Sequence, residues 1–152
     1  MNRYFKIVDD NHRKHKNVEI KLPVRGTKYS AGYDFFSNEE IEIKPNEKYL
    51  FWTDIKANML EDEVLQIHVR SSIGIKKGLT LANITGIIDK DYYNNENNDG
   101  NVGICLRNVG TTSVKIEKYE RIAQGIFQKY LITDDDEVNT ERTGGIGHTD
   151  KK

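Results

Sequence analysis

The residues best suited to chemistry begin with Arg70, Ser71 and Ser72, followed by Gly74. They place a guanidinium and two hydroxyls beside a permissive glycine backbone, and these groups together can hold phosphate oxygens. Taken alone, the same residues also fit an ordinary turn. A phosphate site is therefore one of two interpretations.

A carboxylate follows further along the same stretch. Asp89 comes directly after the apolar run 86–88, and Asp91, Tyr92 and Tyr93 come next. The flat tyrosine rings can lie against a sugar or a base, although an Asp after an apolar strand is also common as a cap or turn former. The order of the two groups, phosphate-binding residues first and carboxylate second, favours a nucleotide site.

The end of the chain carries a third group of this kind. Arg142 and Thr149 enclose the glycine-rich run 143–147, whose main-chain amides can wrap phosphates while the guanidinium meets the terminal charge. The acidic run 134–137 before it favours a solvated connection over a metal site. Outside a nucleotide context, the tail would be a flexible end.

Taken in order, these motifs resemble the dUTP pyrophosphatase (dUTPase) family. The central signature is Arg-Ser-Ser from position 70, a Lys-Gly pair, an Asn and Gly-x-Ile-Asp-x-Asp-Tyr over 86–92. The runs 31–34, 119–124 and 142–149 resemble the family's first, fourth and C-terminal motifs. Short motifs match by chance when they stand alone, but five in order from Ala31 to Thr149 are specific.

The resemblance implies hydrolysis of dUTP to dUMP and pyrophosphate, which supplies dUMP and keeps uracil out of DNA. Asp89 would orient and deprotonate a water that attacks the α-phosphorus, and Asp34 would act on Mg²⁺ through its waters, because magnesium dehydrates reluctantly. The residues implied to stabilise charge on the triphosphate alongside Mg²⁺ are Arg70, Ser71, Ser72, Gln124 and Arg142.

The resemblance also implies how the nucleoside is recognised. Asn83 would read the uracil edge, and Tyr92 would pack against deoxyribose and exclude ribonucleotides. Main-chain groups of Gly86, Ile87, Ile88 and Gly103 would bond the uracil, since buried donors and acceptors reject a mismatched base strongly. The tail contacts implied are Gly145, Ile146, Gly147, His148 and Thr149.

The chain departs from the family pattern at two places. A wholly polar insert over 94–99 precedes the next strand, and such a segment favours a looped extension. In the tail, Ile146 replaces the aromatic residue that stacks on uracil, His148 replaces Ser and Asp150 replaces Gly. Phosphate capture should survive these changes better than stacking. His148 would add either a cationic contact below about pH 6.5 or a neutral hydrogen bond.

Short segments with period-two alternation must position these residues. Such segments predict strands over 18–22, 41–43, 64–69, 102–106, 114–116 and 122–127. Turn formers recur between them, and only residues 57–63 suggest a short helix. Many short strands at this spacing predict an all-β fold, a jelly-roll-like sandwich or barrel with a flexible C-terminal arm.

Length and composition narrow the class of protein. The 152 residues suit a single domain spanning 1–152, with a linker over 134–140 and a mobile tail over 141–152. A formal net charge of −1 gives no basic field for direct nucleic-acid binding. The single cysteine, Cys105, is expected as a buried apolar filler in a reducing cytoplasm, and no apolar run reaches the ~20 residues of a membrane span.

Two alternatives remain open at this stage. A dCTP deaminase-related enzyme would share the fold, although the Gly-x-Ile-Asp-x-Asp-Tyr run favours the pyrophosphatase and the chain has no zinc-deaminase signature. A regulatory binding protein could use the nucleotide pocket as a switch, with 94–99 as its contact surface. The family resemblance further implies a homotrimer with shared sites, in which one subunit supplies Ser71 and Gln124, a second Asp89 and Tyr92, and a third the Arg142 tail.

Overall fold

The chain is built almost wholly from short β-strands. The computed structural model describes residues 1–150, with the side chain of His148 outside the described part. The strands are β1 (Tyr4–Ile7), β2 (Val24–Arg25), β3 (Tyr33–Phe36), β4 (Ile41–Ile43), β5 (Lys48–Trp52), β6 (Ile55–Asn58), β7 (Glu63–Val69), β8 (Leu79–Leu81), β9 (Gly86–Ile88), β10 (Gly103–Asn108), β11 (Val114–Ile116) and β12 (Arg121–Lys129). Helical turns occur at η1 (Ser72–Lys76), η2 (Lys90–Tyr92) and η3 (His148–Asp150).

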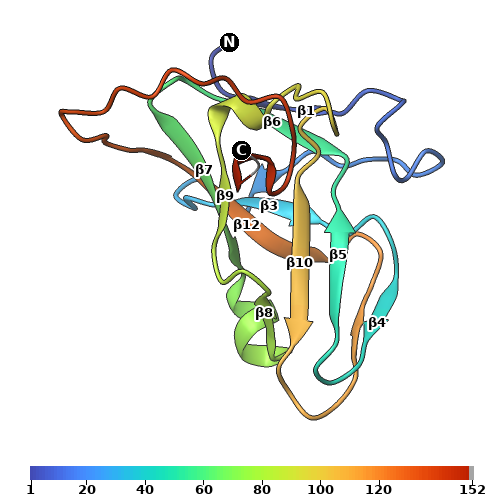
Figure 1. The fold of residues 1–152 in the computed structure, drawn as a ribbon. Helices are drawn as coiled ribbons and strands as arrows, with labels where there is room; N and C mark the ends of the chain where they lie inside the picture. Colours follow the sequence, from blue (N-terminus) through green and yellow to red (C-terminus); the bar gives the residue numbers. More distant parts are fainter. Residues whose placement is uncertain (151–152) are drawn as a thin grey trace.

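The strands pair antiparallel in several small sheets (Figure 1). One sheet has the order β2-β3-β12-β7-β9, a second has the order β5-β10-β8, and β1-β6 and β4-β11 form separate pairs. Neighbours in space are mostly distant in sequence, which is typical of jelly-roll folds rather than of simple meanders. The predicted all-β, jelly-roll-like class is confirmed.

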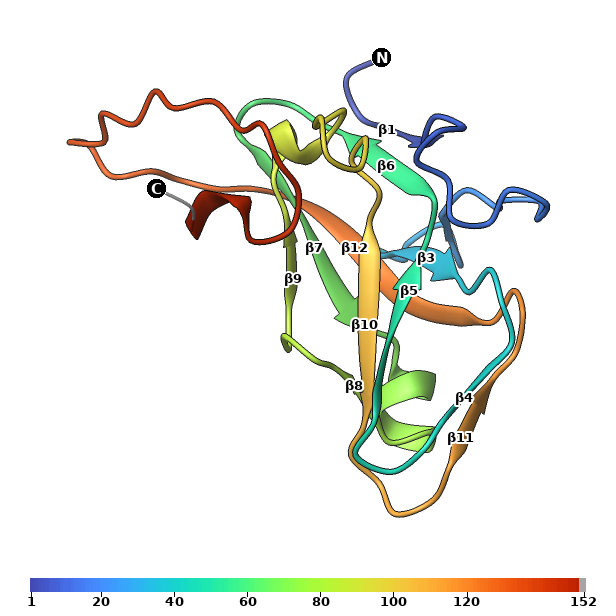
Figure 2. The ribbon, with the colours of Figure 1, turned by 45° about the vertical axis from the view of Figure 1, so that its right-hand side comes forward.

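Alternation along the strands builds the core between the sheets. Leu65 and Ile67 of β7, Ile104 and Leu106 of β10, and Ile122 of β12 are all almost fully buried. Their spacing of two residues places them on one face of each strand. β10 and β7 belong to different sheets (Figure 2), and buried side chains of both join one core cluster.

Most of the predicted strands are present, and two predictions of secondary structure are wrong. The runs 41–43, 64–69, 114–116 and 122–127 lie within β4, β7, β11 and β12, and 102–106 matches β10 from its second residue. Residues 18–22 are described but form no strand, although Ile20 is buried. The expected helix over 57–63 is instead the end of β6, a turn and the start of β7, because Ile55, Ala57 and Met59 are buried with period two.

After β12 the chain becomes an arm, defined here as residues 130–150. β12 ends at Lys129, which pairs with Glu63 at the start of β7. From there the arm, drawn from orange to red, extends away from the sheets and returns to them near β9 (Figures 1 and 2). No helix among the described residues is long and apolar enough to cross a membrane.

Candidate active site

A hollow of about 290 Å³ gathers most of the predicted nucleoside and tail residues. It lies between β9, the chain around Gly103 and the returning arm, and is called the base pocket below. Its lining residues are Ile67, Leu81, Asn83, Gly86, Ile87, Ile88, Asp89, Tyr92, Gly103, Arg142, Gly145, Ile146, Gly147 and Thr149. Residues more than sixty positions apart in the sequence thus meet at one site.

The wall formed by β9 has main-chain groups to offer. β9 pairs with β7 through Gly86 to Ile88, and it is the last strand of its sheet among the described residues. The outer edge of such a strand carries N–H and C=O groups without strand partners, which can pair with a flat polar ligand as they would with another strand. Gly86 is required here, because a Cβ at that position would lie 2.8 Å from the Cβ of Ile67.

Asp89 stands at the mouth of the base pocket and is bound by the arm. Arg142 donates from Nη2 to Asp89 Oδ2 at 2.9 Å and from Nε to Asp91 Oδ1 at 2.8 Å. Both carboxylates are about half exposed, whereas the Arg142 side chain is 11% exposed. One guanidinium therefore bridges two carboxylates, and an incoming anion must compete with them for it. Sequence reasoning missed this use of Asp91, although its Asp-x-Asp spacing with Asp89 was visible.

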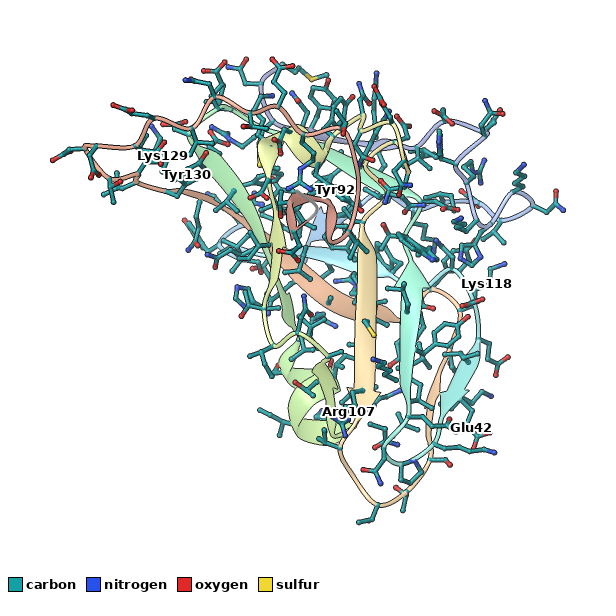
Figure 3. All side chains as sticks on the ribbon, viewed as in Figure 1. Glu42, Tyr92, Arg107, Lys118, Lys129 and Tyr130 are labelled. Atoms are coloured by element: carbon teal, nitrogen blue, oxygen red, sulfur yellow. The ribbon has the colours of Figure 1, made fainter. Side chains whose placement is uncertain are left out.

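Tyr92 forms part of the pocket floor and is held at its hydroxyl. It is 6% exposed, accepts a hydrogen bond from Asn98 Nδ2 at 2.8 Å and donates one to the Asn101 carbonyl at 2.7 Å. Burial raises the pKa of its hydroxyl, which the hydrogen bond from Asn98 and the charge of Arg142 partly offset. Figure 3 shows Tyr92 close to the arm.

Three predicted site residues and Arg121 form a second group, here called the phosphate cluster: Asp34, Arg70, Arg121 and Gln124. Asp34 is 5% exposed, accepts a hydrogen bond from Arg121 Nη1 at 3.0 Å and forms an ion pair with Arg70 Nε at 3.0 Å. Gln124 donates to the Val69 carbonyl at 3.3 Å. Two guanidiniums around one carboxylate leave an excess positive charge, which suits a polyphosphate. Arg121 was not among the predicted site residues, and its ion pair helps to hold the Asp34 carboxylate in place.

The two serines begin the turn η1, whose main chain differs from expectation. Ser71 is exposed and Ser72 half-buried. The amides of Ile73 and Gly74 both donate to the Arg70 carbonyl, at 3.0 and 2.9 Å. The expected support of a phosphate by amides near Gly74 is therefore wrong for these two groups, because the helical turn already uses them.

The phosphate cluster and Asp89 lie at opposite ends of β7. Leu65 pairs with Ile88, so Asp89 stands beside the first residues of the strand, whereas Arg70 follows its last residue. The five residue steps from Val64 to Val69 span ~17 Å at about 3.3 Å per residue. That separation exceeds the reach of the β- and γ-phosphates of a nucleotide whose α-phosphorus is beside Asp89. Within one chain, the two groups cannot serve the same substrate.

The Asp34 carboxylate fits a magnesium ion whose direct ligands come mainly from the substrate. Among residues 1–150, no three His, Cys, Asp or Glu side chains gather closely enough to hold a metal by themselves. Each oxygen of Asp34 is paired with a guanidinium, yet the carboxylate keeps acceptor capacity for a water. Such a carboxylate suits contact with a metal-bound water, and phosphate oxygens would supply direct ligands.

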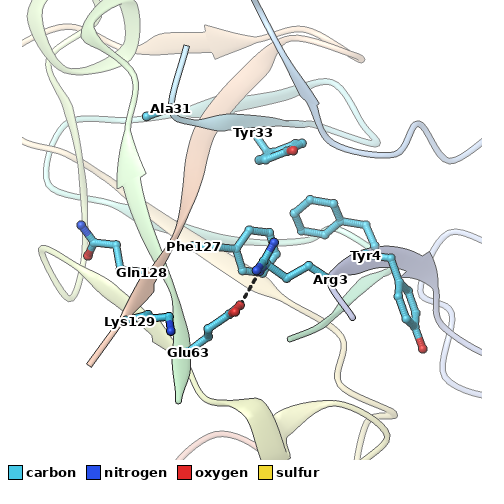
Figure 4. A pocket seen from close by; sticks show the side chains of 9 residues that line it. Arg3, Tyr4, Ala31, Tyr33, Glu63, Phe127, Gln128 and Lys129 are labelled. Atoms are coloured by element: carbon cyan, nitrogen blue, oxygen red, sulfur yellow. Dashed lines mark hydrogen bonds and ion pairs between the residues drawn. The ribbon is translucent and has the colours of Figure 1, made fainter. Parts of the chain in front are cut away.

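A larger hollow of about 500 Å³ contains none of the predicted site residues (Figure 4). Phe5, Tyr33 and Phe127 form its aromatic part, and Arg3 Nε pairs with Glu63 Oε2 at 2.6 Å at one side. Its size alone is a weak argument for a site, because it lacks convergent chemistry of the kind that the base pocket has.

The polar insert over 94–99 is partly buried, unlike the looped extension expected from its composition. Asn95, Asn98 and Asp99 are all more than nine-tenths buried. The segment forms turns, in agreement with the expected loop, but it packs under Tyr92 and against the arm instead of extending into solvent.

In the arm, Ile146 is 68% exposed, and the prediction for the side chain of His148 falls outside the described part. Cys105 is only partly buried, which corrects the expected buried filler, and burial raises its pKa.

Comparison with known proteins agrees with this geometry. The model of the dUTPase family matches residues 18–149. The chain is 47% identical over 138 residues to the deoxyuridine 5'-triphosphate nucleotidohydrolase of Lactococcus lactis, covering 90% of this chain and 92% of that protein. The solved dUTPase of Streptococcus mutans aligns with a TM-score of 0.73 at 39% identity, covering 86% of this chain and 98% of that one. A dUTPase of phage 80alpha aligns at 0.70 with 27% identity, covering 91% and 96%.

Proposed function

Since the chain belongs to the dUTPase family and is a dUTP diphosphatase, we propose that Asp89 is its catalytic base and that copies of the chain share each active site. The observation that carries this proposal is the placement of Asp89 between a pocket with a free main-chain edge and the Arg142 guanidinium, which can exchange Asp89 for a more highly charged anion. The products are dUMP and pyrophosphate.

The base pocket supports uracil recognition by main-chain groups. The free edge of β9 supplies donors and acceptors in a fixed row, and Asn83 lies in the same lining. A base whose edge does not match leaves these groups unpaired, which costs more than a difference in size. Tyr92 lies beside Asp89, where a sugar would link the base to the α-phosphate, and its fixed ring would leave no room for a 2′-hydroxyl.

The reaction needs Asp89 to be free of Arg142. A half-exposed carboxylate can hold a water by one oxygen and take its proton as that water attacks the α-phosphorus. The triphosphate carries more charge than the two carboxylates that Arg142 now bridges, so the guanidinium would move from Asp89 to the phosphates as substrate enters. The arm thereby uncovers the base as it covers the substrate.

Magnesium would be held by the triphosphate, with Asp34 contacting its waters, and it would neutralise charge on the phosphate oxygens. Arg70, Ser71, Ser72 and Gln124 would orient the β- and γ-phosphates at the phosphate cluster. The cytoplasmic location expected from the sequence stays a prediction.

The separation along β7 supports a shared site. Because ~17 Å divides Asp89 from the phosphate cluster of the same chain, a second copy must bring its own Arg70 and Ser71 to the substrate. We infer a homotrimer, as the family resemblance implies. In the isolated chain the arm covers its own base pocket, and in the trimer it closes the pocket of a neighbouring copy.

Asp89→Asn tests the role of the base. The amide cannot accept the proton, so kcat for dUTP should fall by at least about a hundredfold, while the Kd of a non-hydrolysable dUTP analogue changes little. Asp91→Asn is the matched control, since it removes the same charge from the same arginine. Equal losses of kcat in the two variants, or near-normal turnover of Asp89→Asn, would show that Asp89 is not the base.

A further inference from the structure

An internal network of hydrogen bonds holds the polar segment 94–99 in place. Asn95 Nδ2 donates to the Tyr92 carbonyl at 2.8 Å and to Asn98 Oδ1 at 2.7 Å, and its own Oδ1 accepts from the amides of Asn97 and Asn98. Asn98 Oδ1 also accepts from the Gly100 amide at 3.0 Å. Buried amides with this many partners are fixed in one arrangement.

The base of the segment is tied to the rest of the fold by charge. Asp99 Oδ2 pairs with Lys56 Nζ and accepts from the Asp9 amide, both at 2.8 Å. Lys56 also donates to Asn94 Oδ1 at 2.6 Å. These contacts lie on strand β6 and the chain after β1, so the segment cannot shift without breaking a largely buried ion pair.

The upper side of the segment meets the arm. The Glu96 amide donates to the Thr143 carbonyl at 3.3 Å. A Cβ at Gly145 would lie 2.9 Å from Asn98 Nδ2 and 3.0 Å from Asn97 Oδ1. The arm therefore fits this surface only because position 145 lacks a side chain. Asn97 is exposed and can swing aside, whereas Asn98 is pinned by its hydrogen bonds.

We propose that the 94–99 segment is the seat on which the arm closes, and that Asn98 is the positioning residue that joins this seat to Tyr92. The inference rests on the proposed function, because it assigns the segment a part in sugar selection and closure at that site. Asn98 acts through Tyr92 and Gly145 and touches no substrate. The amide that fixes the tyrosine hydroxyl is the same amide that receives the arm.

The seat is tested first without turnover, by tryptic cleavage after Arg142 in the free protein. Gly145→Ala should unseat the arm and speed that cleavage at least about fivefold, because cleavage follows the population of the open form. Adding Asn98→Ala should restore slow cleavage by removing the fixed amide. Adding Asn97→Ala should not, because that side chain already has room to move. The proposed seat would be contradicted if Gly145→Ala were cleaved at the wild-type rate. It would also be contradicted if Asn98→Ala and Asn97→Ala restored slow cleavage equally.

The positioning role is tested by the ratio of kcat/KM for dUTP over UTP. Asn98→Ala should lower this ratio about fivefold, the size expected for loss of one hydrogen bond. Tyr92→Phe should lower it at least as much, because it also removes the bond to the Asn101 carbonyl. The double variant should lose little more than Tyr92→Phe alone, since both changes remove the link between Asn98 and the hydroxyl. Asn97→Ala should keep the wild-type ratio. Additive losses, or an unchanged ratio in Asn98→Ala, would refute the positioning role.

Two controls separate the possible failures. Thermal unfolding of each variant shows whether a change in the ratio reflects general destabilisation. If Asn98→Ala folds poorly, Tyr92→Phe still tests the link, because Asn98 keeps its bonds to Asn95 and Gly100 in that variant. A wild-type protein that fails to hydrolyse dUTP would defeat the proposed function, whereas the cleavage experiment would still decide the seat.

Discussion

Mixing two inactive variants tests the shared site most directly. Asp89→Asn removes the base at one end of β7. Ser71→Asp places a negative charge at the other end, where it would repel the triphosphate. Ser71 is exposed, so the new carboxylate should not disturb folding of the free chain. Each variant alone should have almost no turnover, because every one of its sites carries the same defect.

The ~17 Å between the two positions sets the expected recovery. If each site takes its base from one chain and its phosphate cluster from another, random assembly of equal amounts restores about one quarter of the sites. If both came from one chain, the mixture would restore none. The two outcomes differ by far more than the error of a pyrophosphate-release assay.

The assay is steady-state dUTP hydrolysis after the two chains are unfolded together and refolded, compared with each variant refolded alone. Ser113→Asp, at another exposed serine, controls for the added charge and should retain full activity. Light scattering should give three times the chain mass of 17.5 kDa. Activity of the mixture no higher than the mean of its parents, or a monomeric mass, would refute the argument from strand length.

Two further predictions concern the arm and the alkaline limit of the fold. Ending the chain after Asp136 removes Arg142 and the glycines, so kcat should fall sharply while far-UV circular dichroism and the unfolding midpoint stay near wild type; unchanged kcat would make the arm a mere flexible end. Burial, together with the hydrogen bond to Tyr4, raises the pKa of Tyr93 to about 12, so the folded state favours the neutral phenol. The stability that this provides is fully present below about pH 10 and should be lost as the pH rises towards 12. Tyr93→Phe should make that decline in the urea midpoint shallower, and parallel declines would contradict the assignment.

The sequence predicted best where local pattern and global burial agree. Alternation over 64–69 and 122–127 predicted β7 and β12, because burial on one face of a sheet imposes period two directly. Residues 18–22 have the same alternation and bury Ile20, yet they form no ladder. Periodicity reports which side chains face a core, and it does not report whether a neighbouring strand is present to pair with.

The sequence likewise predicted only part of the candidate site. The family resemblance implied that Asp89, Tyr92, Gly103 and the tail serve one site, with the tail from a third subunit, and the base pocket gathers them within one chain. The resemblance assigned Ser71 and Asp89 to different subunits, but the motifs alone could not show how far apart Arg70 and Asp89 stand within one chain. The register of β9 against β7 decides that distance, and register depends on contacts outside the motifs.

The insert shows why composition fails for buried asparagine. A run of Asn, Glu and Asp predicts an exposed loop, since burying an unpaired amide is costly. The cost disappears when every amide finds its partners within a few residues, as Asn95 and Asn98 do, and no scale of hydropathy contains that possibility. Gly145 complements this network, because the arm could not approach the fixed Asn98 amide with any larger residue there. The departure from the family's usual strand connection and the glycine of the family's C-terminal motif therefore belong to one contact surface, which only the folded chain brings together.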